Sequence, residues 1–289
     1  MLHPVVARLI ALTIVVGIVF IVWFIPYIPN TSGSNECDCL KVVFLDVGQG
    51  DAILVQTPDG YELLIDGGRD NKVIRELAKG RSFFDKYIDV VVATHPDSDH
   101  IGGLIDVFNR YKIDTLITTT NINDTPASAA FTEAVSLESA DVIYAESGQQ
   151  FTLGASTTIS IFAPYGDETN WESNNASIIL KISYGESDFL LTGDAPAGVE
   201  EFIVEKYRDL LQSEVLKLGH HGSKTSTSEL FLDTVLPEYA VVSAAIDSPY
   251  GHPHQEVMQR VFARDIQTFH TGTEGTVVFE SDGKEIYLK

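Results

Sequence analysis

Cysteine is nearly absent from this sequence, and the two cysteines that occur cannot build a disulfide framework. Cys37 and Cys39 are separated by one residue in a polar stretch. They could form a local bridge, stay free, or join a metal site whose other ligands come from elsewhere. Nothing around them resembles a redox or zinc motif, so we expect no catalytic role for either thiol.

Basic residues are also scarce. The 289 residues include 41 Asp and Glu but only 19 Lys and Arg, which gives a formal net charge of −22. Such a charge repels phosphate backbones at long range, so a nucleic-acid substrate needs a local basic patch or bound cations in order to approach. Adaptation to a salty environment is the alternative explanation of the acidic excess. The hydrophobic content of 44% is that of a folded protein and argues against disorder over most of the chain.

Charge is missing altogether from residues 9–28, a run of about the length that crosses a bilayer. We expect a transmembrane anchor over residues 1–29. A buried core helix and a cleaved secretory signal are the alternatives, and the length favours an uncleaved anchor. Arg8 precedes the run, whereas Glu36 and Asp38 follow it, so the positive-inside rule places the N-terminus in the cytoplasm. The protein is then a single-pass protein of the cell membrane, with most of its chain outside the cytoplasm.

Beyond a polar tether at residues 30–39, hydrophobic runs of strand type alternate with helical patterns up to the end of the chain. The alternation predicts an α/β (α+β) body of two β-rich layers with helices outside, and no boundary divides residues 40–289. The least regular stretch is 121–150, in which NINDTPASAA suggests a loop. Expected strands are centred on KVVFLDV, AILVQT, YELLIDGG, DVVVAT, TLITTT, TISIFAP, SIILKISY, DFLLTGDA, EVLKLG, YAVVSAA, GTVVFES and EIYLK, and expected helices lie near 71–79, 197–207 and 226–235, with others beginning near Ile101 and Pro253.

The sharpest feature is the motif THPDSDHIGG, at residues 94–103, which follows a strand-like run and precedes a helix. It places His95, Asp97, Asp99 and His100 within six residues. Imidazole and carboxylate groups are ligands of divalent metals, and four of them on one turn repel one another or stay solvated unless a cation draws them together. A solvated acidic turn is the alternative, and the position at a strand end with two following glycines argues against it.

Further candidates stand at the ends of other predicted strands: Asp66 in LLIDGG, Asp194 in LLTGDA, and His220 and His221 in LKLGHHGS. Each one alone is a weak signal, since Asp before Gly usually marks a turn. Strand ends meet at one edge of a layered fold, so these side chains can converge. Together with the first motif they predict a site for two metal ions.

The stretches FLDVGQGDAILV, LLIDGG, THPDSDHIGG, LLTGDA, LKLGHHGSKTS and YGHPH lie between Phe44 and His254. In this combination they resemble the metallo-β-lactamase superfamily and, within it, the C-terminal hydrolase domain of ComEC-type competence proteins. The resemblance implies a four-layer αββα sandwich, a dinuclear metal site and hydrolysis, and ComEC-type domains are regarded as nucleases that act on incoming DNA. We expect a freestanding, singly anchored relative, because the sequence lacks the many transmembrane helices of a full competence channel.

The resemblance also implies a role for each motif residue. His95 and Asp97 would bind the first metal, Asp99, His100 and His220 the second, and Asp194 would bridge the two. Asp66 resembles the buried aspartate that orients the ligand loop. For His221, such a supporting role and direct ligation stay equally open.

Two departures from the superfamily pattern favour oxygen ligands at the first metal. Asp97 stands where many members carry His, and no His occurs from Ile101 to Gly219. Asn175, or its neighbour Asn174, lies in the corresponding region and could offer an amide oxygen. Oxygen ligands shift the preference from Zn²⁺ toward Mn²⁺ or Mg²⁺.

Three residues are candidates for chemistry at the metals. We expect Asp99 to act at the reacting centre as a ligand of the second metal. His252, in YGHPH, could donate a proton to a leaving alkoxide, and a polar helix cap is its alternative role. Lys224, in HHGSKTS, could steady a phosphate, and a solvated surface side chain is the alternative for it.

These observations predict a hydrolase with two divalent metal ions, Mn²⁺ or Zn²⁺ and otherwise Mg²⁺, that acts as a phosphodiesterase or nuclease on DNA outside the cytoplasm. The expected partners are nucleic acid or another phosphodiester and, through the N-terminal helix, the membrane; no protein partner can be inferred. A lactone, thioester or β-lactam substrate on the same fold is the first alternative. A non-catalytic surface binding protein is the second.

A basic stripe gives the substrate a predicted path. Lys72, Arg75 and Lys79 fall on one side of the helix that follows LLIDGG, with Arg69 before it and Arg81 after it. This is the densest basic run in the chain. It indicates a route for a nucleic-acid backbone along the rim of the metal cleft, and a solvated helix face is the alternative.

Overall fold

The computed structural model describes residues 38–79, 81 and 85–289. The predicted anchor at 1–29 and the tether up to residue 37 lie outside the described residues, so the anchor stays a prediction. Among the residues that are described, no helix is long and apolar enough to cross a membrane. The part from Asp38 to Lys289 forms one compact unit.

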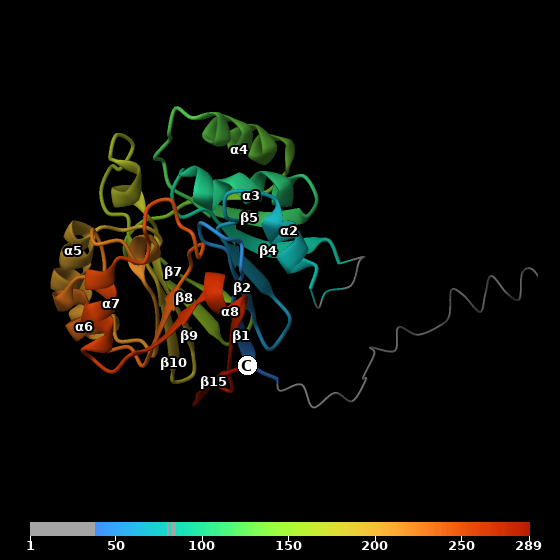
Figure 1. The fold of residues 1–289 in the computed structure, drawn as a ribbon. Helices are drawn as coiled ribbons and strands as arrows, with labels where there is room; N and C mark the ends of the chain where they lie inside the picture. Colours follow the sequence, from blue (N-terminus) through green and yellow to red (C-terminus); the bar gives the residue numbers. More distant parts are fainter. Residues whose placement is uncertain (1–37, 80, 82–84) are drawn as a thin grey trace, which may run out of the picture. The chain divides into compact units, whose positions relative to one another are not determined.

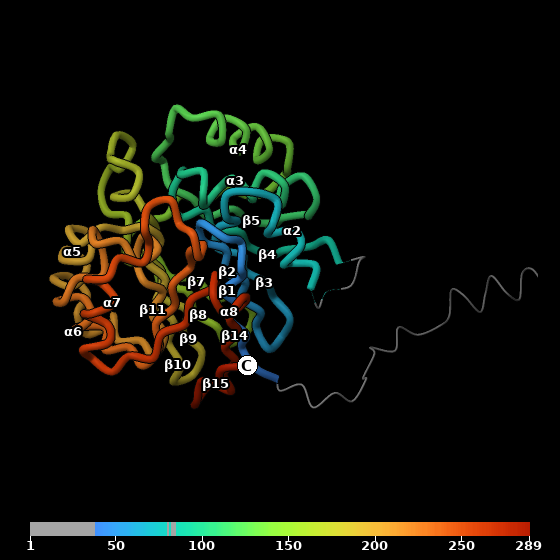
Figure 2. The backbone as a smooth tube through the Cα atoms, in the orientation of Figure 1, coloured from blue at the N-terminus to red at the C-terminus, as the bar shows by residue number. Residues whose placement is uncertain are grey.

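The first half of the chain and its last two strands build an eight-stranded sheet (Figure 1). Its strands are β1 (Leu40–Phe44), β2 (Ile53–Gln56), β3 (Glu62–Ile65), β4 (Tyr87–Val92), β5 (Lys112–Thr118), β6 (Asp141–Tyr144), β14 (Val277–Ser281) and β15 (Ile286–Leu288). They are arranged in the order β15-β14-β1-β2-β3-β4-β5-β6. Strands β3 to β6 pair in parallel. The first strand, β1, pairs antiparallel with β14, the next-to-last strand of the chain (Figure 2).

The second half of the chain builds a seven-stranded sheet. Its strands are β7 (Gln150–Leu153), β8 (Thr157–Ala163), β9 (Ile179–Tyr184), β10 (Ser187–Leu191), β11 (Val215–Lys217), β12 (Tyr239–Val242) and β13 (Gln267–His270). They are arranged in the order β13-β12-β11-β10-β9-β8-β7. Strands β10 to β13 pair in parallel. Each sheet therefore has a parallel half whose strands end at one edge, which is where side chains from successive loops can meet.

Helices cover the outer face of each sheet, because parallel neighbours need crossover connections. Helices α2 (Lys72–Leu77), α3 (Ser98–Phe108) and α4 (Pro126–Leu137) join the parallel strands of the first sheet. Helices α5 (Ala197–Tyr207), α6 (Glu229–Val235) and α7 (Gln255–Phe262) cover the second. The short elements are α8 (Thr271–Glu274), η1 (Ser173–Ala176), η2 (Arg208–Leu210) and η3 (Gly219–Gly222).

The main hydrophobic core lies between the two sheets. In β1 the buried residues alternate, so that Leu40, Val42 and Phe44 face this core. Phe189 from the second sheet and Phe279 from β14 pack edge to face at 6.2 Å between ring centroids. Two further buried clusters fill the spaces between each sheet and its helices. The four-layer αββα arrangement expected from the sequence is therefore confirmed.

The stretch 121–150 is more regular than its sequence suggests. The expected loop ends at Thr125, because helix α4 begins at Pro126. The Thr125 hydroxyl caps the helix by accepting from the backbone N–H of Ser128 at 3.2 Å. Proline at the first helical position after threonine is a helix-start signal that outweighs the turn-forming composition of the segment. Strands β6, β7 and β13 also add to the expected set, and β6 is exposed along its whole length, so it shows no hydrophobic alternation.

Paired glycines dock the loop after β3 onto the first turns of α3. The Gly67 N–H donates to the His100 carbonyl oxygen at 2.8 Å, and the Gly103 N–H donates to the Gly68 carbonyl oxygen at 2.9 Å. A Cβ on Gly102 would lie 2.2 Å from the carbonyl oxygen of Arg69, which leaves no room for a side chain. This docking holds the loop after β3 directly against the helix that carries the ligand motif.

We expect Gly102→Ala to lower the free energy of unfolding by about 1–3 kcal/mol, because the new methyl group forces the two backbones apart. Urea denaturation of the full-length protein measures the change. Gly198→Ala is the matched control, since a Cβ at this exposed position of helix α5 meets nothing within 4 Å. That variant should be neutral or stabilised by up to about 1 kcal/mol. Equal effects in the two variants would contradict the close docking.

Candidate metal centre

The chemistry-bearing side chains of both sheets meet at the ends of the parallel strands. Helix α3 begins at Ser98, three residues before the expected start near Ile101, so the ligand motif spans the loop after β4 and the first turn of this helix. The residues that follow strand ends are Asp66 after β3, His95, Asp97, Asp99 and His100 after β4, Asp194 after β10, and His220 and His221 after β11. Both sheets therefore contribute to one site.

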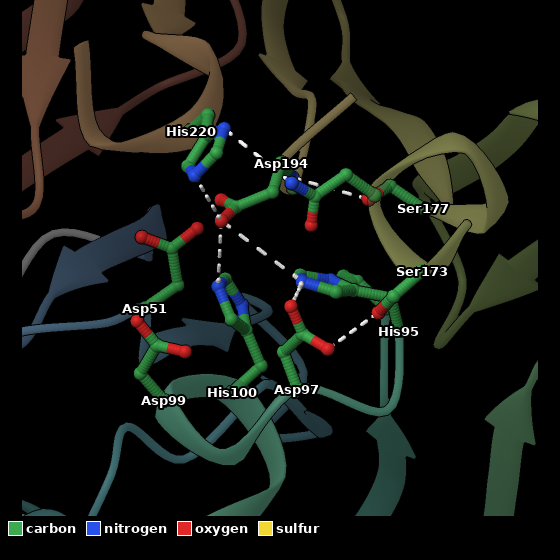
Figure 3. Close-up of polar contacts among 12 residues, drawn as sticks. Asp51, His95, Asp97, Asp99, His100, Ser173, Ser177, Asp194 and His220 are labelled. Carbon is green, nitrogen blue, oxygen red and sulfur yellow. Dashed lines mark hydrogen bonds and ion pairs between the residues drawn. The ribbon is translucent and has the colours of Figure 1, made fainter. Parts of the chain in front are cut away.

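One carboxylate oxygen lies at the centre of the site. Four imidazole nitrogens surround Oδ2 of Asp194, and His95, His100 and His220 are seen pointing toward it (Figure 3). The distances from Asp194 Oδ2 to the Nε2 atoms are 3.3 Å for His100, 3.4 Å for His221, 3.7 Å for His220 and 4.0 Å for His95. Four histidines around one carboxylate form the donor set of a divalent cation.

Asp66 orients two of these histidines. Its fully buried carboxylate accepts from the backbone N–H of Thr94 at 2.8 Å and from the Thr94 hydroxyl at 2.7 Å, and it lies 2.7 Å from Nδ1 of His100. Because the Thr94 hydroxyl donates to Asp66, it can only accept from Nδ1 of His95, at 3.0 Å. Both histidines then hold a proton on Nδ1 and turn Nε2 toward the site. Burial lowers the pKa of His100, but Asp194 and Asp66 outweigh burial and raise that pKa well above its ordinary value, so a metal ion at Nε2 of His100 would displace a proton.

A second buried pair supports His221. Oδ1 of Asp51 lies 3.5 Å from Nδ1 of His221, and Oδ2 of Asp51 forms an ion pair of 2.6 Å with Nζ of Lys217. Burial alone would raise the pKa of Asp51, but Lys217 and His221 outweigh it and lower that pKa to about 2. Sequence reasoning missed Asp51 and Lys217. Asp51 lies within the quoted stretch FLDVGQGDAILV, and its place directly before a predicted strand was the available signal.

The two remaining motif carboxylates flank the histidines. Asp97 accepts hydrogen bonds through Oδ1 from Asn123 Nδ2, at 2.7 Å, and from the Ser173 hydroxyl, which leaves its Oδ2 at 3.8 Å from Nε2 of His95. Oδ2 of Asp99 lies 3.6 Å from Nε2 of His221. Asp97 therefore lies beside His95, and Asp99 lies beside His221.

Buried polar atoms without partners show that the site fits a metal. The buried atoms at the site for which no hydrogen-bond partner is seen include Nε2 of His95, His100 and His221, and Oδ1 of Asp51 and Asp194. Each such atom costs roughly 1–3 kcal/mol when nothing satisfies it. The ligand atoms of Asp51, His100, Asp194 and His221 all lie within 4.8 Å of one another. A divalent cation among them would satisfy these atoms together.

Charge in the site is balanced by shifts of the histidine pKa values. Burial lowers the pKa of His221, but Asp194, Asp51 and Asp99 outweigh burial and raise it to about 9. Burial and the neighbouring His100 lower the pKa of His95 to about 4. Protonated histidines thus offset part of the negative charge of the buried carboxylates, and a bound metal ion would displace their protons.

The other predicted residues lie at different distances from the centre. Asn174, rather than Asn175, faces the site, with its Nδ2 at 3.5 Å from Nδ1 of His220. Asn175 instead lines a separate cavity. The ring of His252 lies 5.3 Å from that of His220. Lys224 is exposed, and its backbone N–H donates to His254 Nδ1 at 3.1 Å.

The profile of the Metallo-beta-lactamase superfamily matches residues 45–245. The chain belongs to this superfamily. Among its relatives are ComE operon protein 3 of Bacillus subtilis (strain 168), 27% identical over 91% of this chain, and Competence protein ComA of Neisseria gonorrhoeae, 32% identical over 91%. The resemblance to ComEC-type competence proteins is therefore confirmed. The chain spans 35% of the length of each of these two relatives.

Solved structures show the same fold at low sequence identity. The metallo hydrolase Igni18 from Ignicoccus hospitalis aligns with a TM-score of 0.55 and 19% identity, over 84% of this chain and 100% of that one. Zn²⁺-bound PqqB from Methylobacterium extorquens aligns with a TM-score of 0.51 and 12% identity, over 77% of this chain and 85% of that one. These alignments support the superfamily fold of this chain.

We expect Asp66→Asn to weaken divalent-metal binding by about 10–100-fold. Asparagine offers one acceptor oxygen and an NH₂ group, so one of the donors now on Asp66 would face another donor, and His100 would lose its orientation. Calorimetric titration of the full-length protein with Mn²⁺ and Zn²⁺ measures the affinity, and circular dichroism checks the fold. Asp106→Asn, on the same helix α3 but paired with Arg110 at the surface, is the control. Unchanged affinity for both ions in Asp66→Asn would contradict the orienting role.

Proposed function

We propose that this protein is a metal-dependent phosphodiesterase that acts on nucleic acid, with DNA as its expected substrate. The observation that carries the proposal is the convergence of four imidazole nitrogens on Oδ2 of Asp194, beside unpaired buried donor atoms. The name of Competence protein ComA refers to competence, and that of Recombination protein 2 of Haemophilus influenzae refers to recombination, which supports a nucleic-acid substrate. The predicted N-terminal anchor would hold the active site outside the cytoplasm.

The proposal assigns two ions, Mn²⁺ or Zn²⁺ and otherwise Mg²⁺, that share Asp194. His95 and Asp97 would hold the first ion, and Asp99 and His100 the second. His221 suits the second half-site better than His220, since it lies 3.6 Å from Asp99 and 3.4 Å from Asp194. His220 lies 3.7 Å from Asp194, and Nδ2 of Asn174 lies 3.5 Å from Nδ1 of His220, so both stay beside the shared carboxylate. When bound, such ions polarise phosphoryl oxygens and lower the pKa of a nearby water.

The protein's own groups keep this donor set in place. Asp66 holds the rings of His95 and His100 with Nε2 inward. Asp51, which forms an ion pair with Lys217, lies 3.5 Å from Nδ1 of His221. Because these supporting groups are buried, their hydrogen bonds do not have to compete with water. The donor set is therefore organised before any substrate arrives, which lowers the reorganisation needed for hydrolysis.

The full-length protein should hydrolyse single-stranded DNA or bis(nitrophenyl) phosphate only when a divalent ion is supplied. Mn²⁺, Mg²⁺ and Zn²⁺ are compared on DNA, RNA and the nitrophenyl ester, and EDTA should abolish every activity. Asp194→Ala should lower the rate by more than about 100-fold and keep the fold, because both half-sites lose a shared ligand. Asp233→Ala, an exposed aspartate paired with Arg264, is the control. Hydrolysis of a lactone, thioester or β-lactam without any phosphodiester cleavage would overturn the substrate class, and tight metal binding without turnover of any ester would favour a binding protein.

His252 is the proposed proton donor to the leaving group. Burial and the neighbouring His220 and His221 lower its pKa to about 4, so donation requires that the negative charge of a bound phosphate first restores its proton. His252→Ala should slow cleavage of an alkoxide leaving group by on the order of 100-fold and leave nitrophenolate release, which needs no proton, nearly unchanged. Equal losses on both substrates would indicate a structural role.

A further inference from the structure

A cavity of about 480 Å³ opens beside the candidate metal centre. Asp97 and Asp99 form part of its wall, so whatever occupies the cavity lies next to candidate metal ligands. The other lining residues are Arg69, Ser98, Thr125, Pro126, Ala127 and Tyr250. Arg69 is the single basic residue in this lining set, in a chain whose formal net charge is −22.

The backbone of Arg69 is fixed relative to the metal centre. Its carbonyl oxygen would lie 2.2 Å from a Cβ on Gly102, so the two segments touch with no side chain between them. The neighbouring Gly68 accepts from the Gly103 N–H at 2.9 Å. The helix that carries these glycines also carries Asp99 and His100 in its first turn. The backbone of Arg69 is therefore held in a fixed position relative to the candidate ligands Asp99 and His100.

The side chain of Arg69 is exposed and meets Tyr250 at the cavity. A hydrogen bond with Tyr250 is the largest cause that raises the pKa of this guanidinium, and the negative charge of Asp99 adds to it. A guanidinium carries five N–H donors in a planar fork, so one bond to a phenol leaves capacity for a bidentate contact with phosphate.

The basic stripe around α2 is less available than its sequence suggests. Lys79 pairs with Glu76 at 2.6 Å. Arg81 forms an ion pair with Glu62, and its side chain is only 5% exposed. The amino group of Lys72 lies against Gly48, in the loop between β1 and β2. Lys79 and Arg81 are thus paired with glutamates of the protein, whereas Arg75 is exposed, and a phosphate backbone along α2 would compete with these two ion pairs.

We propose that Arg69, positioned by Tyr250, binds a phosphate of the nucleic-acid backbone next to the phosphate under attack, and that the strand enters through this cavity rather than along α2. The inference rests on the proposed function. Helices α3 and α4 both begin at the cavity wall, so the positive ends of their dipoles add to the attraction for phosphate. The Arg69 guanidinium would add directional hydrogen bonds to this attraction.

The test measures binding of fluorescein-labelled single-stranded DNA to the full-length protein by anisotropy, with Ca²⁺ in place of the hydrolytic metal, over a series of salt concentrations. Arg69→Ala should weaken binding about 5–10-fold near 0.1 M salt and reduce the log-log salt slope by about 0.7, the value for one lost contact to a single strand. Arg69→Lys should keep the slope while losing part of the affinity, since the charge stays and the fork is lost. Metal content should match the unaltered protein in both variants.

Arg110→Ala is the matched control, because it removes one positive charge just beyond the opposite end of α3, where Arg110 pairs with Asp106 at 3.0 Å. It should leave affinity and slope unchanged. Equal losses of DNA affinity in Arg69→Ala and Arg110→Ala would show that binding depends only on the overall charge of the protein, and would overturn the inference. So would a slope that falls in Lys72→Ala/Arg75→Ala but not in Arg69→Ala. If the unaltered protein neither binds nor cleaves DNA, RNA or the nitrophenyl ester, the proposed function itself fails, and the inference fails with it.

Discussion

The three hydrogen bonds to the Asp66 carboxylate are the constraint on which the candidate metal centre depends. They connect the end of β3 to the ligand motif after β4, and they bind both the backbone and the hydroxyl of Thr94. Because the Thr94 proton is committed to Asp66, the tautomers of His95 and His100 follow from this one carboxylate. The glycines of the same two motifs bring the segments close enough for these bonds to form.

Charge is the second constraint on the site. Asp51, Asp66 and Asp194 are each at most 3% exposed, and carboxylates removed from water in this way need positive charge beside them. Lys217, itself fully buried, supplies one permanent cation through its ion pair with Asp51. Protonated histidine or a bound divalent ion has to supply the rest. The same demand explains why the pKa of His221 is raised to about 9 despite its burial.

The arrangement also explains how so acidic a chain could handle a phosphodiester. The charge of −22 is spread over the whole sequence, whereas at the site Lys217, the histidines and Arg69 offset the aspartates, and metal ions bound there would make the local charge positive. Local fields near a cleft outweigh a distant and screened surface charge, because the Debye length is about 10 Å at 0.1 M salt. The superfamily fold is compatible with several ester substrates, and the substrate class is decided by these local groups.

Local sequence patterns by themselves determined most of the secondary structure. The bounds of α5, Ala197–Tyr207, agree with its helical pattern, and the alternation in β1 follows from Leu40, Val42 and Phe44. Such patterns act over a few residues, so they can be recognised without the fold. The motif after β4 likewise identified a metal-binding segment, because its four ligand groups are neighbours in the chain.

Tertiary structure alone decided which groups complete that segment. Asp51 precedes β2 of the first sheet and His221 follows β11 of the second, and only the packing of the two sheets brings them to 3.5 Å. Nothing in the sequence separates Asn174 from Asn175, whereas the turn of η1 directs Asn174 to the site. The sequence alone also cannot rank the residues of the basic stripe. Whether a Lys or Arg is available depends on the partners that folding places beside it, and folding left Arg69 at the cavity while it enclosed Arg81.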